Sequence, residues 1–545
     1  MSRFIAALAL VLILISPHAQ AQNSVGVFEN HADVGTVLHP GSTTFDPAKN
    51  SYTVRGSGEN MWATADAFQF AWKKMSGDVE ITADVQFTNL TGNEHKKAVL
   101  MLRQSLDADS VYADVALHAS GLTSLQYREE KGATTSEIES RVNNRVSIVP
   151  VDSKPLEPEY QVPFATNLTL AHLGLTRRGN FIYVSLGEAA HLGAALQHYD
   201  GESIPIPLTG DFYVGIGVCS HDNNVVEEAT FSNVEIKQLT ASTAAPVLYS
   251  NLETVTVETT IRHVIYSAQG RFEAPNWSRD GSYFLFNRNG HIEELPATGG
   301  KPEILNTGFA DRVNNDHGIS PDATQLAISD NSQPTISPTG EGTHDSLVYV
   351  LPITGGTPRR LTKDAPSYWH GWSPDGKTLA FVGQRNGDFD IYTIPVAGGE
   401  ETRITTAKGL DDGPEYSPDG QYIYFNSERT GHMQIWRMHP DGSAQEQVFS
   451  DDYNNWFPHI SPDGKWMVFL TYDRDVTGHP ENKDVMLRLM SLSDKKITVL
   501  AKLFGGQGTI NVPSWAPDSK SLAFVSYQFI DGENGAPAPL MTSEH

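Results

Sequence analysis

Short runs in which apolar and polar residues alternate are the main pattern of this chain, and turn-forming residues follow each run. Residues 378–382, 422–425 and 466–470 are examples from the second half. Alternation with a period of two predicts half-buried β-strands, because successive side chains of a strand point to opposite faces. The first half contains runs of the same kind and no long stretch with a helical period. The pattern predicts an all-β protein.

One short phrase, built around a Ser-Pro-Asp-Gly turn, recurs six times in the second half. The copies occupy residues 275–281, 317–323, 370–376, 414–420, 458–464 and 513–519. Successive serines, with Ala516 in the last copy, are 42, 53, 44, 44 and 55 residues apart. Such a period is typical of one four-stranded blade. Proline cannot donate to a sheet ladder and glycine accepts a positive φ, so each phrase marks a turn between two strands. We therefore predict a six-bladed β-propeller over residues 255–527.

The boundaries of the propeller follow from its last repeat. The final blade is incomplete after Tyr527, and strands at residues 255–257 and 261–266 can complete it. An exchange of this kind closes the ring and leaves no open sheet edge. Residues 241–254 are then expected to be a linker. Residues 528–545, which contain Gly-Ala-Pro-Ala-Pro, are expected to be a mobile tail.

Residues 23–240 lack the repeated phrase and are expected to form a separate domain. Their alternating runs lie at residues 79–87, 98–102, 112–117, 181–185 and 213–218. The length and the number of strands fit an antiparallel β-sandwich. Pro150, Pro155, Pro158 and Pro163 predict a long surface loop within it, because repeated prolines interrupt any ladder.

The first residues predict the compartment. Arg3 precedes an apolar run over residues 4–15, and an Ala-Gln-Ala site ends at Ala21. This arrangement is typical of a cleavable secretory signal peptide, here residues 1–21. We therefore expect a periplasmic or secreted monomer with no transmembrane segment. The lone Cys219 excludes an intrachain disulfide, and the alternation around it predicts a buried, inert thiol.

Charge narrows the possible partners. The chain has 39 Lys and Arg against 65 Asp and Glu, a formal net charge of −26. Nucleic acids and anionic membrane surfaces require clustered basic residues, so neither is an expected partner. The remaining partner classes are a carbohydrate or a protein ligand.

Histidines and carboxylates from different blades are predicted to converge on one mouth of the central channel. Three residues before the serine, two copies of the phrase carry histidine where the other four carry proline. Neutral imidazoles beside carboxylates suit a divalent cation or a general acid–base pair. Alternatively, a histidine fills the proline position and bonds to a neighbouring blade. The catalytic candidates are His317, His370 and Glu415, and the candidate metal ligands are His317, His370, His459 and Asp412.

Aromatic residues and one long loop supply candidate ligand-binding groups near the same mouth. Tyr368, Trp369 and Trp456 flank it, and an aromatic face next to polar groups suits a sugar ring. The hairpin at residues 473–484 is longer than in other blades and brings Arg474, His479 and Lys483, which could reach an anionic ligand. The alternatives are packing against a neighbouring blade for the aromatic rings and a solvated loop for the charged residues.

The repeated phrases resemble those of TolB-like propellers. In the clearest copy the Ser-Pro-Asp-Gly turn is followed by residues 427–431, an Ile-Trp strand at residues 434–438 and a Pro-Asp-Gly turn at residues 440–442. In the first half, residues 56–58, 61–62, 68–72, 76–78 and 229–236 resemble concanavalin-A-like sandwich domains found beside bacterial carbohydrate-active modules. The first resemblance implies a propeller fold, and the second implies a lectin-like partner domain.

Two classes of function fit these observations. The first is a periplasmic or secreted binding protein that holds a carbohydrate or a protein ligand at the propeller mouth and the lectin-like sandwich. The alternative is a carbohydrate-active enzyme, a polysaccharide lyase or glycoside hydrolase, with a histidine and carboxylate site that a divalent metal could assist. The lack of a nucleophile or paired-carboxylate signature favours binding. Elemental analysis of the mature protein would test the metal directly.

Overall fold

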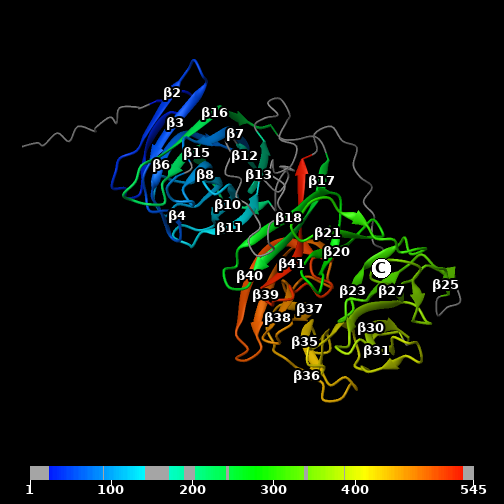
Figure 1. Ribbon diagram of the computed structural model, residues 1–545. Coiled ribbons are helices and arrows are strands. Elements are labelled where there is room, and N and C mark those ends of the chain that lie inside the picture. Colours follow the sequence, from blue (N-terminus) through cyan, green and yellow to red (C-terminus); the bar gives the residue numbers. More distant parts are fainter. Residues whose placement is uncertain are drawn as a thin grey trace, which may run out of the picture.

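The computed structural model describes residues 24–89, 91–141, 171–188, 203–240, 245–336, 342–385 and 387–531. These residues form strands and no helix, which confirms the all-β prediction (Figure 1). None of them belongs to a helix long and apolar enough to cross a membrane. The predicted signal peptide, the proline-rich loop at residues 150–163 and residues 532–545 of the predicted tail lie outside the described residues.

The first domain consists of two antiparallel layers that pack face to face. One layer has the strand order β1-β6-β15-β8-β9-β10-β11 and the other has the order β14-β13-β12-β7-β16-β3-β2. Val79, Leu100, Leu173 and Val214 belong to the buried core between them, as alternation along the strands requires. The first layer comprises β1 (Asn30–Val34), β6 (Phe68–Ser76), β15 (Asp211–Cys219), β8 (Lys97–Arg103), β9 (Tyr112–His118), β10 (Leu122–Arg128) and β11 (Ser136–Arg141). The second comprises β14 (Ile204–Pro205), β13 (Phe181–Glu188), β12 (Ala171–Arg178), β7 (Val79–Phe87), β16 (Glu227–Gln238), β3 (Ser51–Gly56) and β2 (Ser42–Asp46), and a small hairpin is made by β4 (Met61–Trp62) and β5 (Ala65–Asp66).

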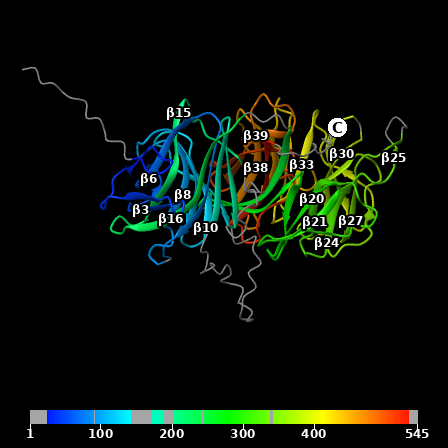
Figure 2. The same cartoon turned by 90° about the horizontal axis from the view of Figure 1, so that it is seen from above.

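The second domain contains five separate four-stranded sheets arranged around an axis (Figures 1 and 2). They are β19 (Glu273–Trp277), β20 (Tyr283–Arg288), β21 (His291–Pro296) and β22 (Glu303–Ile304); β23 (Val313–Ile319), β24 (Gln325–Asp330), β27 (Leu347–Pro352) and β28 (Arg359–Arg360); β29 (Ser367–Trp372), β30 (Thr378–Gln384), β31 (Phe389–Pro395) and β32 (Thr402–Arg403); β33 (Asp411–Tyr416), β34 (Ile423–Ser427), β35 (Gln434–Met438) and β36 (Glu446–Gln447); and β37 (Asn454–Ile460), β38 (Trp466–Tyr472), β39 (Glu481–Ser491) and β40 (Ile497–Gly506). A short hairpin, β25 (Thr335–Ile336) and β26 (Gly342–Thr343), forms a separate two-stranded sheet in the connection between β24 and β27.

The repeated phrase forms the turn between the first and second strands of each sheet. In one copy the Ser417 hydroxyl donates to Asp419 at 2.6 Å and accepts the backbone N–H of Tyr422 at 3.0 Å. Gly420 has a φ of 70°, which a residue with a side chain rarely adopts. The serine and aspartate side chains thus replace the ladder bonds that proline cannot make, and this explains why the phrase recurs.

The sixth repeat differs from the other five, and six matching sheets are not found among the described residues. Its phrase carries Ala516 and Ser519 in place of the usual serine and glycine. Only an isolated bridge, Trp515 to Leu522, precedes β41 (Ser521–Asp531). The strand β41 pairs instead with β17 (Pro246–Thr256), which pairs with β18 (Arg262–Gln269). The predicted exchange of strands between the start and the end of this domain is therefore present.

A continuous sheet joins the two domains. The strand β18 pairs in parallel with β11 of the first domain, with Ile138 opposite Arg262 and Glu139 opposite His263. The sheet thus has ten strands, β1-β6-β15-β8-β9-β10-β11-β18-β17-β41. Residues 246–254, which the sequence predicted as linker, are part of β17, because the open edge of β41 recruits them into its ladder.

Candidate functional site

The innermost strands of the five sheets share an irregularity that sets up the site. The register of each strand shifts shortly before its turn, as between Asp412 and Glu415 or between Trp456 and His459. Ala274, Gly413 and Phe457 have φ values of 57°, 62° and 52° at this point. A β-bulge places an extra residue in one strand and re-aims the side chains beside it. Polar residues on both sides of the bulge thereby contact neighbouring blades.

A polar cluster forms where these strands begin. The Nε2 atom of His370 lies 3.2 Å from Oδ1 of Asp412. His479, from the long hairpin, lies 3.8 Å from the other oxygen of Asp412 through Nε2, and its Nδ1 pairs with Gln507. Asp316 is close enough to His370 and Asp412 for their charges to act on its pKa. We refer to Glu273, Asp316, His370, Asp412 and His479 as the mouth cluster.

The carboxylates of the mouth cluster have opposite pKa shifts. Burial raises the pKa of Asp316 to about 7; the charge of His370 opposes this shift, and those of Asp412 and Glu273 add to it. Burial also raises the pKa of Asp412, but the hydrogen bond and charge of His370 outweigh that effect, so the pKa is lowered. For His370 burial lowers the pKa, yet Asp412 and Asp316 together bring it above its ordinary value. The pKa shifts of His370 and Asp412 thus both favour an ion pair between them, and the neighbouring Asp316 carboxyl, with a pKa of about 7, holds a proton part of the time at neutral pH.

Arg271 and Glu481 lie beside the mouth cluster at Glu273. Arg271 contacts Glu273 at 3.5 Å and Glu481 at 3.0 Å, and its guanidinium lies 4.3 Å from the ring centre of Tyr527. Burial raises the pKa of Glu273, while the charge of Arg271 lowers it. No motif could have indicated Arg271, because it precedes the first repeat and joins the mouth only through the ring closure.

His459 and Glu415 form a second polar pair, separate from the mouth cluster. Nδ1 of His459 lies 2.5 Å from a Glu415 oxygen, and its Nε2 lies 2.5 Å from the carbonyl oxygen of Ile510. Burial lowers the pKa of the neighbouring Arg279, and the charge of Glu415 partly opposes that shift. This pair is buried between blades near the turns, so it holds the ring together at a different level of the channel.

The predicted metal ligands are not brought together. His317 is completely buried, and burial lowers its pKa to about 4. His459 is engaged by Glu415 and Ile510, and only His370 and Asp412 of the predicted set meet. Among the residues that the structure describes, no group of three His, Cys, Asp or Glu side chains could hold a metal ion. His370 and Asp412 thus form one pair, His459 belongs to another with Glu415, and the buried His317 joins neither.

The predicted aromatic ligand groups differ in exposure. Trp369 and Trp456 are 1% and 2% exposed, so neither presents a ring face to solvent. Trp369 fills the space left by Gly318, where an added Cβ would lie 2.0 Å from its ring. Trp456 packs against His479 with ring centres 4.5 Å apart. Tyr368 is half-buried, and burial raises its pKa, as do the nearby charges of Asp316 and Asp412.

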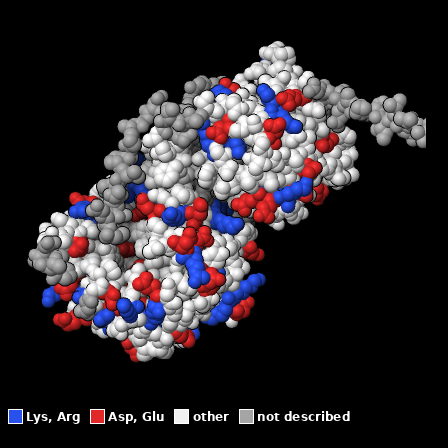
Figure 3. Space-filling model, turned by 180° about the vertical axis from the view of Figure 1, so that it is seen from behind, with Lys and Arg blue, Asp and Glu red and all other residues white. Residues whose placement is uncertain are grey.

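The long hairpin contributes one of its three predicted residues. His479 reaches the mouth cluster. Arg474 pairs with the exposed Asp452 at 3.1 Å, and Lys483 is exposed. Cys219 is buried as predicted, and burial raises the pKa of its thiol to about 11. On the face seen in Figure 3, acidic and basic side chains of the described residues are interspersed.

Comparison with known proteins defines the class of the second domain. Residues 341–528 match the model of the TolB beta propeller domain. The domain is a TolB-like β-propeller.

The relatives narrow this class to a family. The chain is 48% identical over 279 residues to the uncharacterized protein Atu1656 of Agrobacterium fabrum (strain C58), which covers 51% of this chain and 92% of the relative. The chain belongs to the same family as that protein. A solved structure assigned as TolB from Agrobacterium tumefaciens shares 48% identity, covering 52% of this chain and 99% of that one, with a TM-score of 0.49. TolB from Acinetobacter baumannii shares 17% identity over 49% of this chain and 66% of that one, with a TM-score of 0.38.

Proposed function

We propose that this protein is a periplasmic or secreted binding protein whose propeller mouth holds a carbohydrate or protein ligand. The observation that carries the proposal is the mouth cluster, in which buried and half-buried carboxylates and histidines from different blades converge beside the half-buried Tyr368. Convergent polar groups at the end of a rigid scaffold are typical of a binding site. The cleavable signal predicted for residues 1–21 supports the location.

The charge of the mouth cluster defines the ligand groups that it accepts. The cluster and its surroundings contain more carboxylates than arginines. The carboxylates are Glu273, Asp316, Asp412 and Glu481, and the arginine is Arg271, which contacts Glu273 and Glu481. Ionised carboxylates are acceptors only, so a complementary ligand offers hydroxyl, amide or ammonium donors. A sugar edge and a peptide segment with a lysine or arginine both satisfy this condition.

Binding is tested with the full mature chain on a neutral glycan array and on a displayed peptide library. We expect a ligand that the wild type retains and that Asp412→Asn binds at least about tenfold more weakly, because one charge-assisted hydrogen bond is lost. The exposed Asp388→Asn serves as the matched control and should bind like the wild type. Retention of every ligand by Asp412→Asn would remove the mouth cluster from the proposal.

A second candidate, a polysaccharide lyase or glycoside hydrolase, is favoured by the opposite pKa shifts of Asp316 and Asp412. Such a pair separates an acid from a base at neutral pH. Here Asp316 would donate a proton and Asp412, paired with His370, would support the base. New reducing ends or ultraviolet-absorbing unsaturated products from neutral and acidic polysaccharides would identify catalysis. Activity that survives in Asp316→Asn would exclude this assignment.

We further propose the finer architecture that positions these groups. The segment around Trp515, with β41, β17 and β18, acts as a sixth blade that closes the ring. The first domain, residues 23–240, is a concanavalin-A-like sandwich. Support comes from the bridge between Trp515 and Leu522, the pairing of β41 with β17, and the two-layered core of the first domain.

A further inference from the structure

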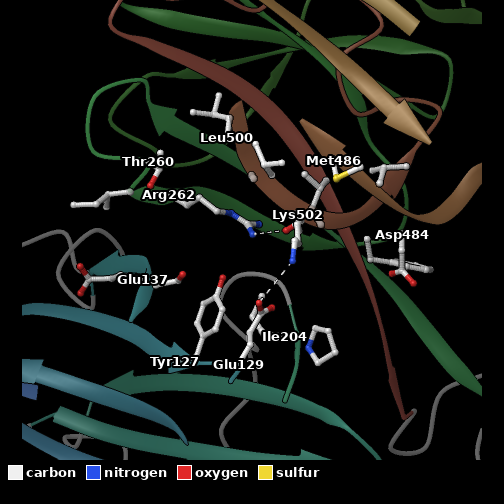
Figure 4. A pocket seen from close by; sticks show the side chains of 18 of the residues that line it. Tyr127, Glu129, Glu137, Ile204, Thr260, Arg262, Asp484, Met486, Leu500 and Lys502 are labelled. Atoms are coloured by element: carbon white, nitrogen blue, oxygen red, sulfur yellow. Dashed lines mark hydrogen bonds and ion pairs between the residues drawn. The ribbon is translucent and has the colours of Figure 1, made fainter. Parts of the chain in front are cut away.

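A pocket of about 550 Å³ lies at the junction of the two domains. From the first domain it is lined by β10, β11, β13 and β14, and from the second by β39, β40 and the turn between β17 and β18. Figure 4 shows Tyr127 and Glu129 of the first domain facing Arg262 and Lys502 of the second across this space. It shares no lining residue with the mouth cluster, although Asp473 and Asp484, at the two ends of the hairpin that carries His479, line it.

The two walls of the pocket are fixed to each other. The parallel pairing of β11 with β18 makes them parts of one sheet. Glu139 pairs with His263 at 2.8 Å, and the Tyr183 hydroxyl donates to the carbonyl oxygen of Phe529 at 3.2 Å. Continuous hydrogen bonding across a junction restricts the relative motion of the domains. The pocket is therefore a preformed feature of the molecule, as ligand sites usually are.

Apolar side chains in the pocket are exposed to solvent. Phe181 is 39% exposed and Val499 is 46% exposed, and both belong to the eight large hydrophobic residues that are exposed in the described part of the chain. Trp62 is half-buried at the same wall, and the Lys97 ammonium lies 5.3 Å from its ring centre. Exposed aromatic and aliphatic groups inside a concave site indicate a surface that a ligand covers.

The charged groups of the pocket are mainly carboxylates. Glu129, Glu137, Asp473 and Asp484 line it, against Arg262 and Lys502. Arg262 is buried and forms an ion pair with Glu253 at 2.8 Å, and Lys502 lies 3.9 Å from Glu129. The Glu137 carboxylate is held in place by the side-chain amide of Gln126 at 2.9 Å. The pocket therefore offers acceptors to a ligand and has an excess of negative charge.

We propose that this pocket binds a short oligosaccharide that carries no acidic groups. The exposed ring of Phe181 and the nearby Trp62 would stack on the apolar face of a sugar, and Glu137 and Asp484 would accept hydrogen bonds from its hydroxyl or amino groups. A uronic acid oligomer would be repelled by the same carboxylates. The inference adds a second site to the proposed binding function, and it does not depend on the propeller mouth being occupied.

Isothermal titration of the full mature chain tests this inference with four hexasaccharides, of glucose, N-acetylglucosamine, glucosamine and galacturonic acid. We expect binding of at least one of the first three and none of the galacturonic acid hexamer. Phe181→Ser should weaken that binding at least tenfold, whereas Phe309→Ser, which changes a similarly exposed ring on the propeller, should leave it unchanged. Asp484→Asn, at an exposed position, should weaken it several-fold.

The outcome at this pocket is distinguishable from the outcome at the propeller mouth. Asp412→Asn should bind the hexasaccharide like the wild type, because Asp412 does not line the pocket. The inference is overturned if no hexasaccharide binds, if the galacturonic acid hexamer binds equally well, or if Phe181→Ser and Asp484→Asn both bind normally. Loss of binding in Asp412→Asn alone would assign the saccharide to the mouth cluster and likewise overturn the inference.

Discussion

Single side chains in the mouth cluster make stability depend on pH, and Asp316 does so most clearly. Its pKa is about 7 in the folded protein against an ordinary value of 3.8. Between these values the native state keeps a proton that the unfolded state has lost. Stability is therefore highest below about pH 4 for this group and falls as the pH rises toward 7.

Asp316→Asn should remove this pH dependence. We expect the melting temperature of the variant, relative to that of the wild type, to increase as the pH rises from 4 to 8, because the amide needs no proton. At about 1.4 kcal/mol for each pKa unit, the gain is on the order of 4 kcal/mol. The loss of the Asp316 charge should also lower the pKa of His370, which that charge raises. Melting curves at each pH, with Asp388→Asn as control, measure the difference; a constant difference across the range would contradict the shift.

His459 should matter for stability rather than for ligand binding. His459→Ala removes the partner of the buried Glu415 and leaves the Ile510 carbonyl oxygen without its hydrogen bond. Removing one member of a buried pair typically costs about 3–5 kcal/mol. We therefore expect the urea midpoint to fall sharply while binding at the mouth is retained in the folded fraction. An unchanged midpoint would show that the contact is dispensable.

Strands and turns show which features the sequence could predict. The turn at Ser417 and Asp419 could be predicted from the sequence, because all of its hydrogen bonds lie within six residues. An exchange of strands to complete the last blade could also be predicted, since an incomplete blade requires a partner strand, but residues 246–254 of β17 were predicted as linker. The side-chain contacts of the site could not be predicted, because the β-bulge changes which residues face the channel. Trp369 was expected to face a ligand, yet the absence of a side chain at Gly318 lets it pack between blades.

The closing strands should depend on one buried ion pair. Glu253 on β17 binds Arg262 on β18 at 2.8 Å and also accepts a hydrogen bond from Ser526 on β41. Glu253→Ala removes the buried carboxylate that pairs with the buried Arg262, so we expect a loss of about 3–5 kcal/mol in the free energy of unfolding. Asp452→Ala, which breaks the exposed pair with Arg474, should cost less than about 1 kcal/mol. Equal losses in chemical denaturation would contradict a special role for the closing strands.

The whole molecule combines two domains that share a sheet but need not fold together. The relative Atu1656 aligns along 92% of its length with only 51% of this chain, so the family includes members without an equivalent of the rest. The strand β17 lies at the division, since it follows the first domain directly and completes the ladder of β41. A propeller fragment that begins after β17 leaves the β17-facing edge of β41 unpaired in the sheet that closes the ring.

Two fragments of the second domain should therefore behave differently. The fragment 245–531 retains β17 and should unfold in one cooperative transition, whereas the fragment 257–531 lacks β17 and exposes the hydrogen-bonding groups of β41. We expect the shorter fragment to aggregate or to melt without a sharp transition. Circular dichroism melting and size-exclusion chromatography compare the two. A cooperative, monomeric 257–531 fragment would show that the ring closes without β17. The pairing of β17 with β41 would then serve only to attach the first domain to the propeller.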